Sequence, residues 1–225
     1  MTVEAIPSQE STPDRLLQAG LSRARADGLR KLTVRSIAQD AGVNLGSFVY
    51  HFGSRDAFIA QLIEHWYAPL MARTQSMLAL LGTRPLTLKD LVLDLIDWVL
   101  QERQFIGHLV MDAASGEHAA QAFLRGCGDR HPALLLAAIE AAQHAGQVRA
   151  EDPRHVLLFL VSAIGLPVLL LESLGGRHIL PTELVDAFET FSLEREHVAK
   201  RLDWVLQGLS PVPCAAPPSI PSHHA

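Results

Sequence analysis

The side chains whose types and spacing could do chemistry gather in residues 33–55, which are rich in hydroxyl, amide, imidazole and guanidinium groups. Such groups hydrogen-bond to phosphate oxygens and to the edges of bases. Asn44, Leu45 and Ser47 fall together at the beginning of one short predicted helix, where they could read base edges in a major groove. The residues that we predict to contact DNA are Thr33, Arg35, Asn44, Leu45, Gly46, Ser47, Tyr50, His51 and Arg55.

Two short helices are expected to position these side chains. Thr33 occupies the place of an N-cap before a helical pattern of apolar residues, and Gly42 is placed to end that helix. Asn44 can then cap a second helix that runs through Phe52. Two short helices joined by a tight turn that contains glycine are typical of a helix-turn-helix. A preceding helix that ends at residues 27–28 completes a unit of three helices.

Some of these residues have a second interpretation. Thr33 and Asn44 would cap helices in any protein, and His51 could be a packed histidine instead of a phosphate ligand. Phe48 and Phe52 are expected in the core. Both interpretations stay open for the two caps and for His51.

The remaining reactive side chains indicate neither a metal centre nor an active site. The sequence has 11 histidines, but outside the C-terminal tail no two are three or four residues apart, so no helix offers a pair of metal ligands. Cys127 and Cys214 are too few and too distant for a disulfide framework or a zinc ribbon. Nucleophile elbows, phosphate-binding glycine loops and zinc-protease helices are missing. We therefore predict no enzyme and no cofactor.

Composition is that of a soluble helical protein. Hydrophobic residues make up 48% of the 225 residues and charged residues 19%, with few aromatics. The net charge is −5, but residues 13–58 hold seven basic and four acidic residues, whereas residues 59–225 hold twelve and eighteen. A mildly basic head on an acidic body suits a protein that presents one end to phosphates.

Glycines and prolines divide the rest of the chain into further helices, so the expected fold class is all-α with about nine or ten helices. The helices predicted after the first three span residues 55–81, 87–102, 103–114, 116–126, 132–146, 153–175 and 181–208. The expected domains are a disordered N-terminus (1–12), a helix-turn-helix domain (13–54), a helical effector-binding and dimerisation body (55–210) and a disordered Pro-rich tail (211–225).

The segment TVRSIAQDAGVNLGSFVYHFGSRDAF, residues 33–58, resembles the DNA-binding signature of the TetR/AcrR family. Two positions depart from the family pattern: Val49 stands where Tyr is common, and Leu45 where Lys or Arg is common. Both departures remove polar contacts from the recognition helix and could shift them to Tyr50 or to thymine methyls. The residues that match in order and spacing are Thr33, Ile37-Ala38, Ala41-Gly42-Val43, Gly46-Ser47, Tyr50-His51-Phe52 and Arg55.

The resemblance implies that the middle helices of the body enclose an effector pocket and that the last two long helices form a four-helix bundle between two copies. The residues that could line the pocket are His65, Trp66, Gln104, His108, Met111, Asp112 and Phe123. For Gln104, His108 and Asp112 the other interpretation is a polar stripe that faces water, and Met111 and Phe123 could be core. The predicted dimer residues, some of which must also belong to the chain's own core, are Leu160, Ile164, Val168, Phe188, Phe191, Val198, Leu202 and Val205.

These expectations add up to a ligand-responsive, cytoplasmic, homodimeric regulator, by family habit a repressor, that binds a palindromic operator in double-stranded DNA. The alternatives are a helical adaptor that binds proteins and, less favourably, a small-molecule enzyme, but neither explains residues 33–58. No signal peptide is expected from the polar start of the chain. The apolar run over 156–171 is shorter than the roughly 20 residues that span a bilayer, so we predict no membrane partner and a helix buried on most sides.

Overall fold

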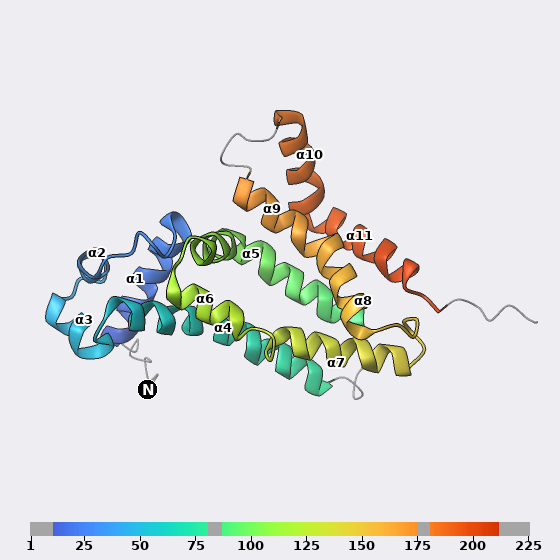
Figure 1. Cartoon of the computed structure of the whole chain (residues 1–225), viewed down its shortest axis with the longest axis horizontal. Coiled ribbons are helices and arrows are strands. Elements are labelled where there is room, and N and C mark those ends of the chain that lie inside the picture. Colours follow the sequence, from blue (N-terminus) through green and yellow to red (C-terminus); the bar gives the residue numbers. More distant parts are fainter. Residues whose placement is uncertain (1–10, 81–86, 175–180, 212–225) are drawn as a thin grey trace, which may run out of the picture.

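The computed structural model describes residues 11–80, 87–174 and 181–211, and over these residues it shows helices and no strand. A head of three short helices lies at one end, and two long helices connect it to a larger helical body (Figure 1). Because α8, the wide turn η1 and α9 form one continuous rod, the described residues make ten separate helices. The all-α fold class is confirmed.

The head consists of α1 (Thr12–Asp27), α2 (Val34–Asp40) and α3 (Leu45–Phe52). Helix α1 begins at Thr12 because the side chain of Ser11 accepts the backbone N–H of Asp14, so two residues assigned to the disordered N-terminus are ordered. The rest of the two predicted disordered ends, residues 1–10 and 212–225, lies outside the described residues. Thr33 caps α2 and Asn44 caps α3, as predicted.

The long helices are α4 (Arg55–Leu80) and α5 (Leu88–Ala114), and α4 continues the core of the head into the body. One hydrophobic cluster joins Leu16 of α1 and Phe48 of α3 to Phe58 of α4 and Phe105 of α5. Helices α1 and α4 approach so closely that a Cβ on Gly20 would lie 2.6 Å from Cζ of Phe58. The head therefore packs on the body through shared apolar side chains.

The remaining helices surround the far half of α5, and α9, α10 and α11 gather on one side of it (Figure 1). They are α6 (His118–Arg125), α7 (His131–His144), α8 (Pro153–Leu160), η1 (Val161–Gly165), α9 (Leu166–Leu174), α10 (Thr182–Leu193) and α11 (Arg195–Gly208). A second hydrophobic cluster, which includes Val156, Ile164, Val198 and Leu202, holds these helices together.

Two predicted helix boundaries are wrong. Helix α5 is continuous where we expect a break between residues 102 and 103, because residues 97–106 contain no glycine or proline and Glu102 is buried within the helix. Conversely, the last predicted helix is divided at Glu194, whose backbone is extended with φ −76° and ψ 122°. The division lets α10 and α11 run in different directions (Figure 1).

The rod from α8 to α9 contains a π-helical turn. The backbone N–H of Leu166 donates to the carbonyl of Val161, five residues earlier. The wide turn lies directly before Pro167, which has no N–H and cannot continue a regular ladder. Such wide turns occur frequently at functional sites.

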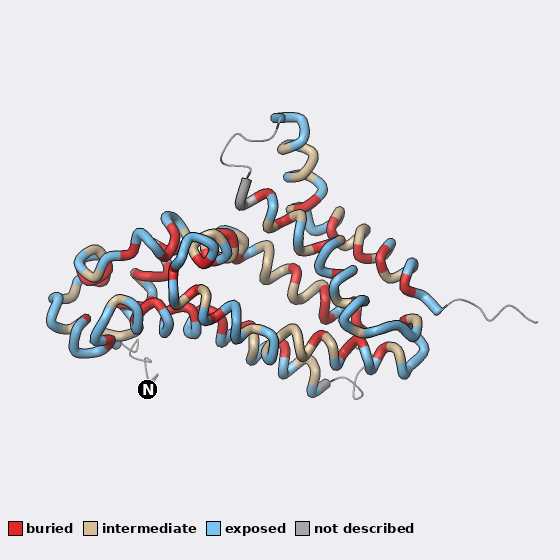
Figure 2. The backbone as a smooth tube through the Cα atoms, in the orientation of Figure 1, coloured by how far each residue is buried: buried red, intermediate tan, exposed pale blue. Residues whose placement is uncertain are grey.

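The same rod is buried on one side only, which contradicts our prediction of burial on most sides. The segment Pro153–Leu171 is long and apolar enough to cross a membrane, with a mean hydropathy of 2.1, and only 28% of its 18-residue window is buried. One side packs on α5, α7 and α11. Exposed residues alternate with buried ones along the rod (Figure 2), and those at its surface include Leu158, Phe159, Val161, Leu166 and Leu170.

Candidate nucleic-acid interface and apolar cavity

Helix α3 presents an exposed face that contains no carboxylate. Phe48 and Phe52 point into the core of the head, and the opposite side is open. Tyr50 is 84% exposed and Val49 is 54% exposed, and Leu45 lies one turn before Val49. Gly46 lies one turn before Tyr50 and adds no side chain, so the backbone itself can approach a flat partner there. Val49 belongs to this face although our predicted contacts omit it.

The two helix caps use part of their hydrogen-bonding capacity internally. The side-chain oxygen of Thr33 accepts the backbone N–H of Ser36 at 3.1 Å. Oδ1 of Asn44 accepts the backbone N–H of Ser47 at 2.8 Å and its hydroxyl at 3.2 Å. The amide nitrogen of Asn44 donates to no residue in the described part of the chain, so both of its hydrogens are available to an external acceptor. Whether these residues and His51, which is exposed, contact DNA stays a prediction.

Most arginines of the head are engaged in contacts within the chain, either inside the head or between head and body. The guanidinium of Arg35, by contrast, is exposed on α2 and pairs with no acidic side chain in the described part of the chain. It lines an open groove between α2 and α3 with Gln39, Val43 and Leu45. The arginines that are used internally are Arg15 on carbonyls after α2, Arg23 on Asp40, Arg25 on Glu102 and Arg55 on Glu117.

The guanidinium of Arg55, a predicted phosphate ligand, is engaged in internal contacts. Its guanidinium donates to the carbonyl oxygens of Leu29 and Leu32, both at 2.8 Å, and to Glu117 at 3.0 Å. Arg55 begins α4, so these bonds tie the loop before α2 to the start of α6. The residue joins head to body and does not offer a free cation.

Two acidic residues of α5 make further links to the head. Glu102, which is 7% exposed, accepts three hydrogen bonds from Arg25 of α1, two at 2.9 Å and one at 3.1 Å. The same carboxylate accepts the indole N–H of Trp66 at 2.9 Å. Oδ2 of Asp112 accepts the backbone N–H of Leu29 at 2.6 Å, just after α1 ends. These bonds link α5 directly to α1 and to a residue just after its end.

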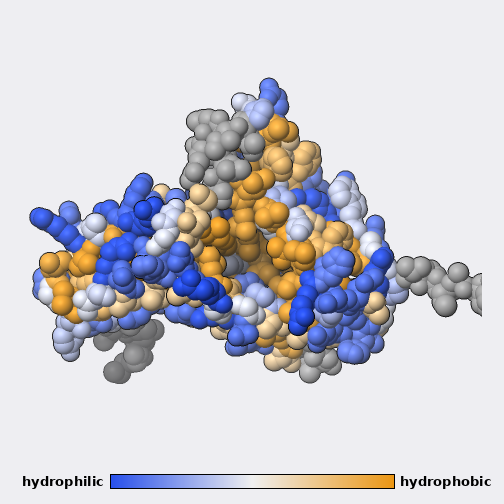
Figure 3. Space-filling model, in the orientation of Figure 1, coloured by the Kyte–Doolittle hydropathy of each residue, from blue (hydrophilic) through white to orange (hydrophobic). Residues whose placement is uncertain are grey.

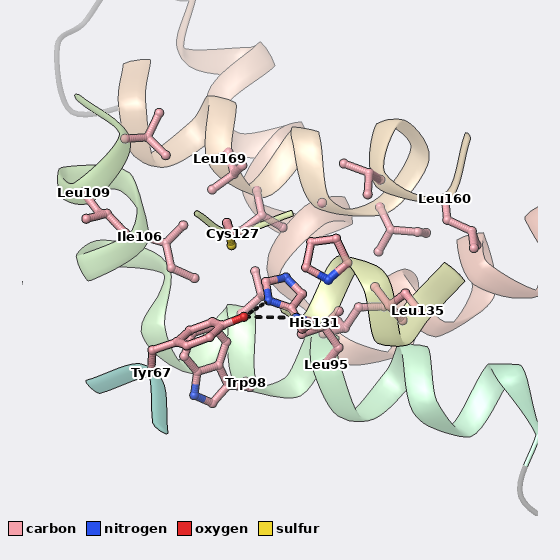
Figure 4. Close-up of a pocket in the computed structure, with 18 of the residues that line it drawn as sticks. Tyr67, Leu95, Trp98, Ile106, Leu109, Cys127, His131, Leu135, Leu160 and Leu169 are labelled. Carbon is pink, nitrogen blue, oxygen red and sulfur yellow. Dashed lines mark hydrogen bonds between the residues drawn. The ribbon is translucent and has the colours of Figure 1, made fainter. Parts of the chain in front are cut away.

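An apolar cavity of about 280 Å³ lies in the body, between α4, α5, α6, α7 and the α8–α9 rod. Figure 3 shows apolar side chains gathered around a hollow in the middle of the visible face. Figure 4 shows that Trp98, Ile106 and Leu109 of α5 face Leu160 and Leu169 across it. The π-helical turn forms part of the wall through Val161, Ile164 and Gly165.

The polar groups of the cavity form one cluster. The hydroxyl of Tyr67 hydrogen-bonds to Nδ1 of His131 and accepts the backbone N–H of His131 at 3.3 Å (Figure 4). Burial lowers the pKa of His131 to about 4 and raises the pKa of Tyr67 to about 12. Burial also raises the pKa of the Cys127 thiol, which lies beside Tyr67. At neutral pH all three groups are therefore uncharged.

Of the seven residues predicted for the effector pocket, Trp66 and Phe123 line the cavity and the others do not. His65 and Gln104 are exposed, and Met111 is not part of the wall. His108 and Asp112 turn toward the head, where a Cβ on Gly28 would lie 2.9 Å from Oδ2 of Asp112. Of the polar stripe on α5, Gln104 faces water, whereas His108 and Asp112 contact the end of α1. Residues that the prediction missed are Tyr67, Trp98, Cys127 and His131.

Most of the predicted dimer residues belong to the chain's own core. Val198 and Leu202 are fully buried inside the body, and Ile164 is 3% exposed. These side chains point inward because α11 packs on the rod. Phe191 is 53% exposed, and Phe188 is half-buried, so both stay candidates. The predicted residues that the core takes up are Leu160, Ile164, Val168, Val198, Leu202 and Val205.

The geometry of the head defines a helix-turn-helix protein, and comparisons with known proteins show which family the head is similar to. Residues 16–62 match the sequence model described as "Bacterial regulatory proteins, tetR family". A segment of 73 residues is 36% identical to the HTH-type transcriptional repressor KstR2 of Mycolicibacterium smegmatis, and it covers 32% of this chain and 36% of that repressor. The chain thus spans about a third of that relative's length.

Solved structures agree over nearly the whole chain. A protein from Mesorhizobium loti assigned to the TetR-family transcriptional regulators has a TM-score of 0.64 at 13% identity, over 88% of this chain and 94% of that one. Thermus thermophilus FadR, a TetR-family repressor in complex with lauroyl-CoA, has a TM-score of 0.55 at 17% identity, over 91% and 98%. At these identities the likeness shows the fold. The matched head, residues 16–62, supports a TetR-family regulatory protein.

Proposed function

We propose that this protein is a cytoplasmic transcriptional repressor that binds a palindromic operator as a homodimer and releases it when a small molecule enters the apolar cavity. The observation that carries the proposal is the face of α3, a short helix with exposed Tyr50 and Val49 on a head that matches the TetR DNA-binding domain. The recognition helix of such a unit lies in the major groove. Repression is supported by the KstR2 relative, which is named a repressor.

Release follows from the contacts between α5 and the head. Trp66 and Ile106 line the cavity, and the indole of Trp66 is bonded to Glu102, which holds Arg25 of α1. A ligand that moves the cavity wall shifts the head through these bonds, so it favours one spacing of the two heads in a dimer. The FadR structure, which is in complex with lauroyl-CoA, supports a small-molecule ligand for this protein as well.

Dimerisation is supported by the exposed apolar stripe on the rod. Phe159, Leu166 and Leu170 are each at least 40% exposed, and Trp204 of α11 is 59% exposed. Contiguous apolar surface of this kind marks a protein–protein interface. We expect Leu166→Glu to convert a dimer into a monomer in light scattering. Val49→Glu, a matched change on exposed α3, should leave the dimer intact.

The experiment that tests DNA binding is selection of bound duplexes from a random pool, followed by titration of the best site at several salt concentrations. A palindrome should emerge, and the affinity should fall steeply with salt. Arg35→Ala should weaken binding to all sequences and reduce the salt slope by about 2, one contact from each copy. Arg154→Ala, an exposed arginine on α8, removes the same charge and should change neither. Without an enriched site or a salt dependence, the protein is not a DNA-binding regulator.

A further inference from the structure

The cavity wall contains no charged side chain in the part of the chain that the structure describes. Its lining consists of aliphatic and aromatic residues, with Tyr67, Cys127 and His131 as the polar members. The nearby cation Arg130 lies behind the aromatic wall, 5.1 Å from the centre of the Phe123 ring, and is paired with Glu64 at 2.7 Å. A charged ligand would lose its hydration here without gaining an opposite charge.

The space is too large to be a packing defect. Interiors are packed with few voids larger than a water molecule, and about 280 Å³ is close to the lower end of the roughly 300–1,000 Å³ typical of ligand sites. The cavity also reaches the surface, because Val110 and Leu124 in its wall are 36% and 39% exposed. A small molecule can therefore enter between α5 and α6.

The hydrogen bonds around Tyr67 determine what the cavity offers to a ligand. The Tyr67 hydroxyl shares a hydrogen bond with Nδ1 of His131, and its oxygen already accepts the backbone N–H of the same residue. We infer from this second bond that Tyr67 is the donor to Nδ1. A neutral imidazole whose Nδ1 accepts carries its hydrogen on Nε2. Nε2 makes no hydrogen bond to any described residue. The imidazole thus supplies an N–H donor to a wall that is mostly apolar.

We propose that the effector is an uncharged, largely apolar small molecule with one hydrogen-bond acceptor, such as a ketone or ester oxygen, which Nε2–H of His131 holds. The inference rests on the proposed function, because it names the ligand class of the cavity through which release would act. Acyl-CoA thioesters, whose phosphates are charged, do not fit this wall. A carboxylate of the same chain length as a bound ketone should be rejected.

The test compares 2-octanone with octanoate by isothermal titration calorimetry of the full chain at pH 7.5. We expect 2-octanone to bind at least tenfold more tightly than octanoate. Quenching of tryptophan fluorescence should accompany binding, because Trp66 and Trp98 are in the wall whereas Trp204 is on the surface. Octanoate binding as tightly as 2-octanone, or neither probe binding at millimolar concentration, overturns the proposal.

The role of the imidazole is tested with p-xylene, an apolar probe without an acceptor. His131→Phe should weaken 2-octanone about tenfold and leave p-xylene unchanged, and Tyr67→Phe should weaken 2-octanone less because Nε2 loses only its orientation. Equal loss of both probes in His131→Phe, or no loss of 2-octanone in both variants, refutes the donor role. Binding of the selected duplex by the same preparations shows separately whether the proposed regulator stands.

Discussion

The ion pair between Arg25 and Glu102 should be worth far more to stability than its distances alone suggest. The pair joins α1 to α5, 77 residues apart in the sequence, and the side chain of Glu102 is only 8% exposed. Arg25→Ala leaves that carboxylate with the indole N–H of Trp66 as its remaining partner. A buried charge that loses its counter-ion costs about 3–5 kcal/mol, but Arg25 itself is 39% exposed and water can replace part of it.

We therefore expect Arg25→Ala to lower the free energy of unfolding by about 2–3 kcal/mol. For a chain of this size that corresponds to a fall in melting temperature of roughly 4–12 °C. The matched control is Arg195→Ala, which breaks a two-bond pair with Asp97 whose side chains are 62% and 37% exposed. An exposed pair is worth about 0–1 kcal/mol, so the control should lower the melting temperature by less than about 4 °C.

The measurement is thermal unfolding followed by circular dichroism, with all variants at one protein concentration because a dimer is stabilised by mass action. If Arg25→Ala and Arg195→Ala melt within 1 °C of each other, burial of Glu102 does not amplify the pair, and the reasoning is refuted. A double variant with Glu102→Gln isolates the charge. It should recover part of the loss, because no buried carboxylate is then left unpaired.

Three further outcomes follow from single positions. Gly28 has φ +87° and a Cβ added to it would meet Asp112, so Gly28→Ala should lower the free energy of unfolding in urea by about 2 kcal/mol or more. The control Gly116→Ala, at φ +96° with open space around it, should cost only the backbone strain of about 1 kcal/mol. Equal losses in the two variants would rule out the Asp112 contact. Between pH 6.5 and pH 4, His131 is protonated in the unfolded chain but stays neutral in the folded protein, because burial lowers its pKa to about 4. The free energy of unfolding should therefore fall as the pH falls through this window, by about 2 kcal/mol at pH 5. In His131→Phe the free energy of unfolding in urea should depend less on pH, and an unchanged pH dependence contradicts the buried neutral imidazole. Tyr50→Ala should weaken binding of the selected duplex by about tenfold or more. It should not change the melting temperature, because the side chain is 84% exposed. If the variant binds the duplex as tightly as the unchanged protein, Tyr50 is not part of the interface.

The sequence alone determined the features that depend on neighbours along the chain. Thr33 and Asn44 cap α2 and α3 as predicted because a cap needs only the backbone N–H of a residue three positions later. Phe48 and Phe52 are buried because helical spacing already places them on one side of α3. The helix-turn-helix and the all-α class follow from such local rules.

Only the tertiary structure decided which partner each long side chain has. Arg55 looks like a phosphate ligand in the sequence, but Glu117, 62 residues later, and two carbonyl groups use its guanidinium. Asp112 looks like a pocket or solvent residue until the loop after α1 is packed against α5. Charge and spacing along one helix do not show which neighbour its polar face meets.

The same physical reason governs the apolar side chains. The sequence shows that the rod from α8 to α9 is apolar, but an apolar pattern on all sides of a helix does not say which side faces the chain's own core. Because the rod packs on α5 and α11, Ile164 and Val168 are buried, whereas Leu166 and Leu170 stay exposed. The cavity likewise needs Tyr67 and His131, 64 residues apart, to meet across α4 and α7, and only the packing of those helices brings them together.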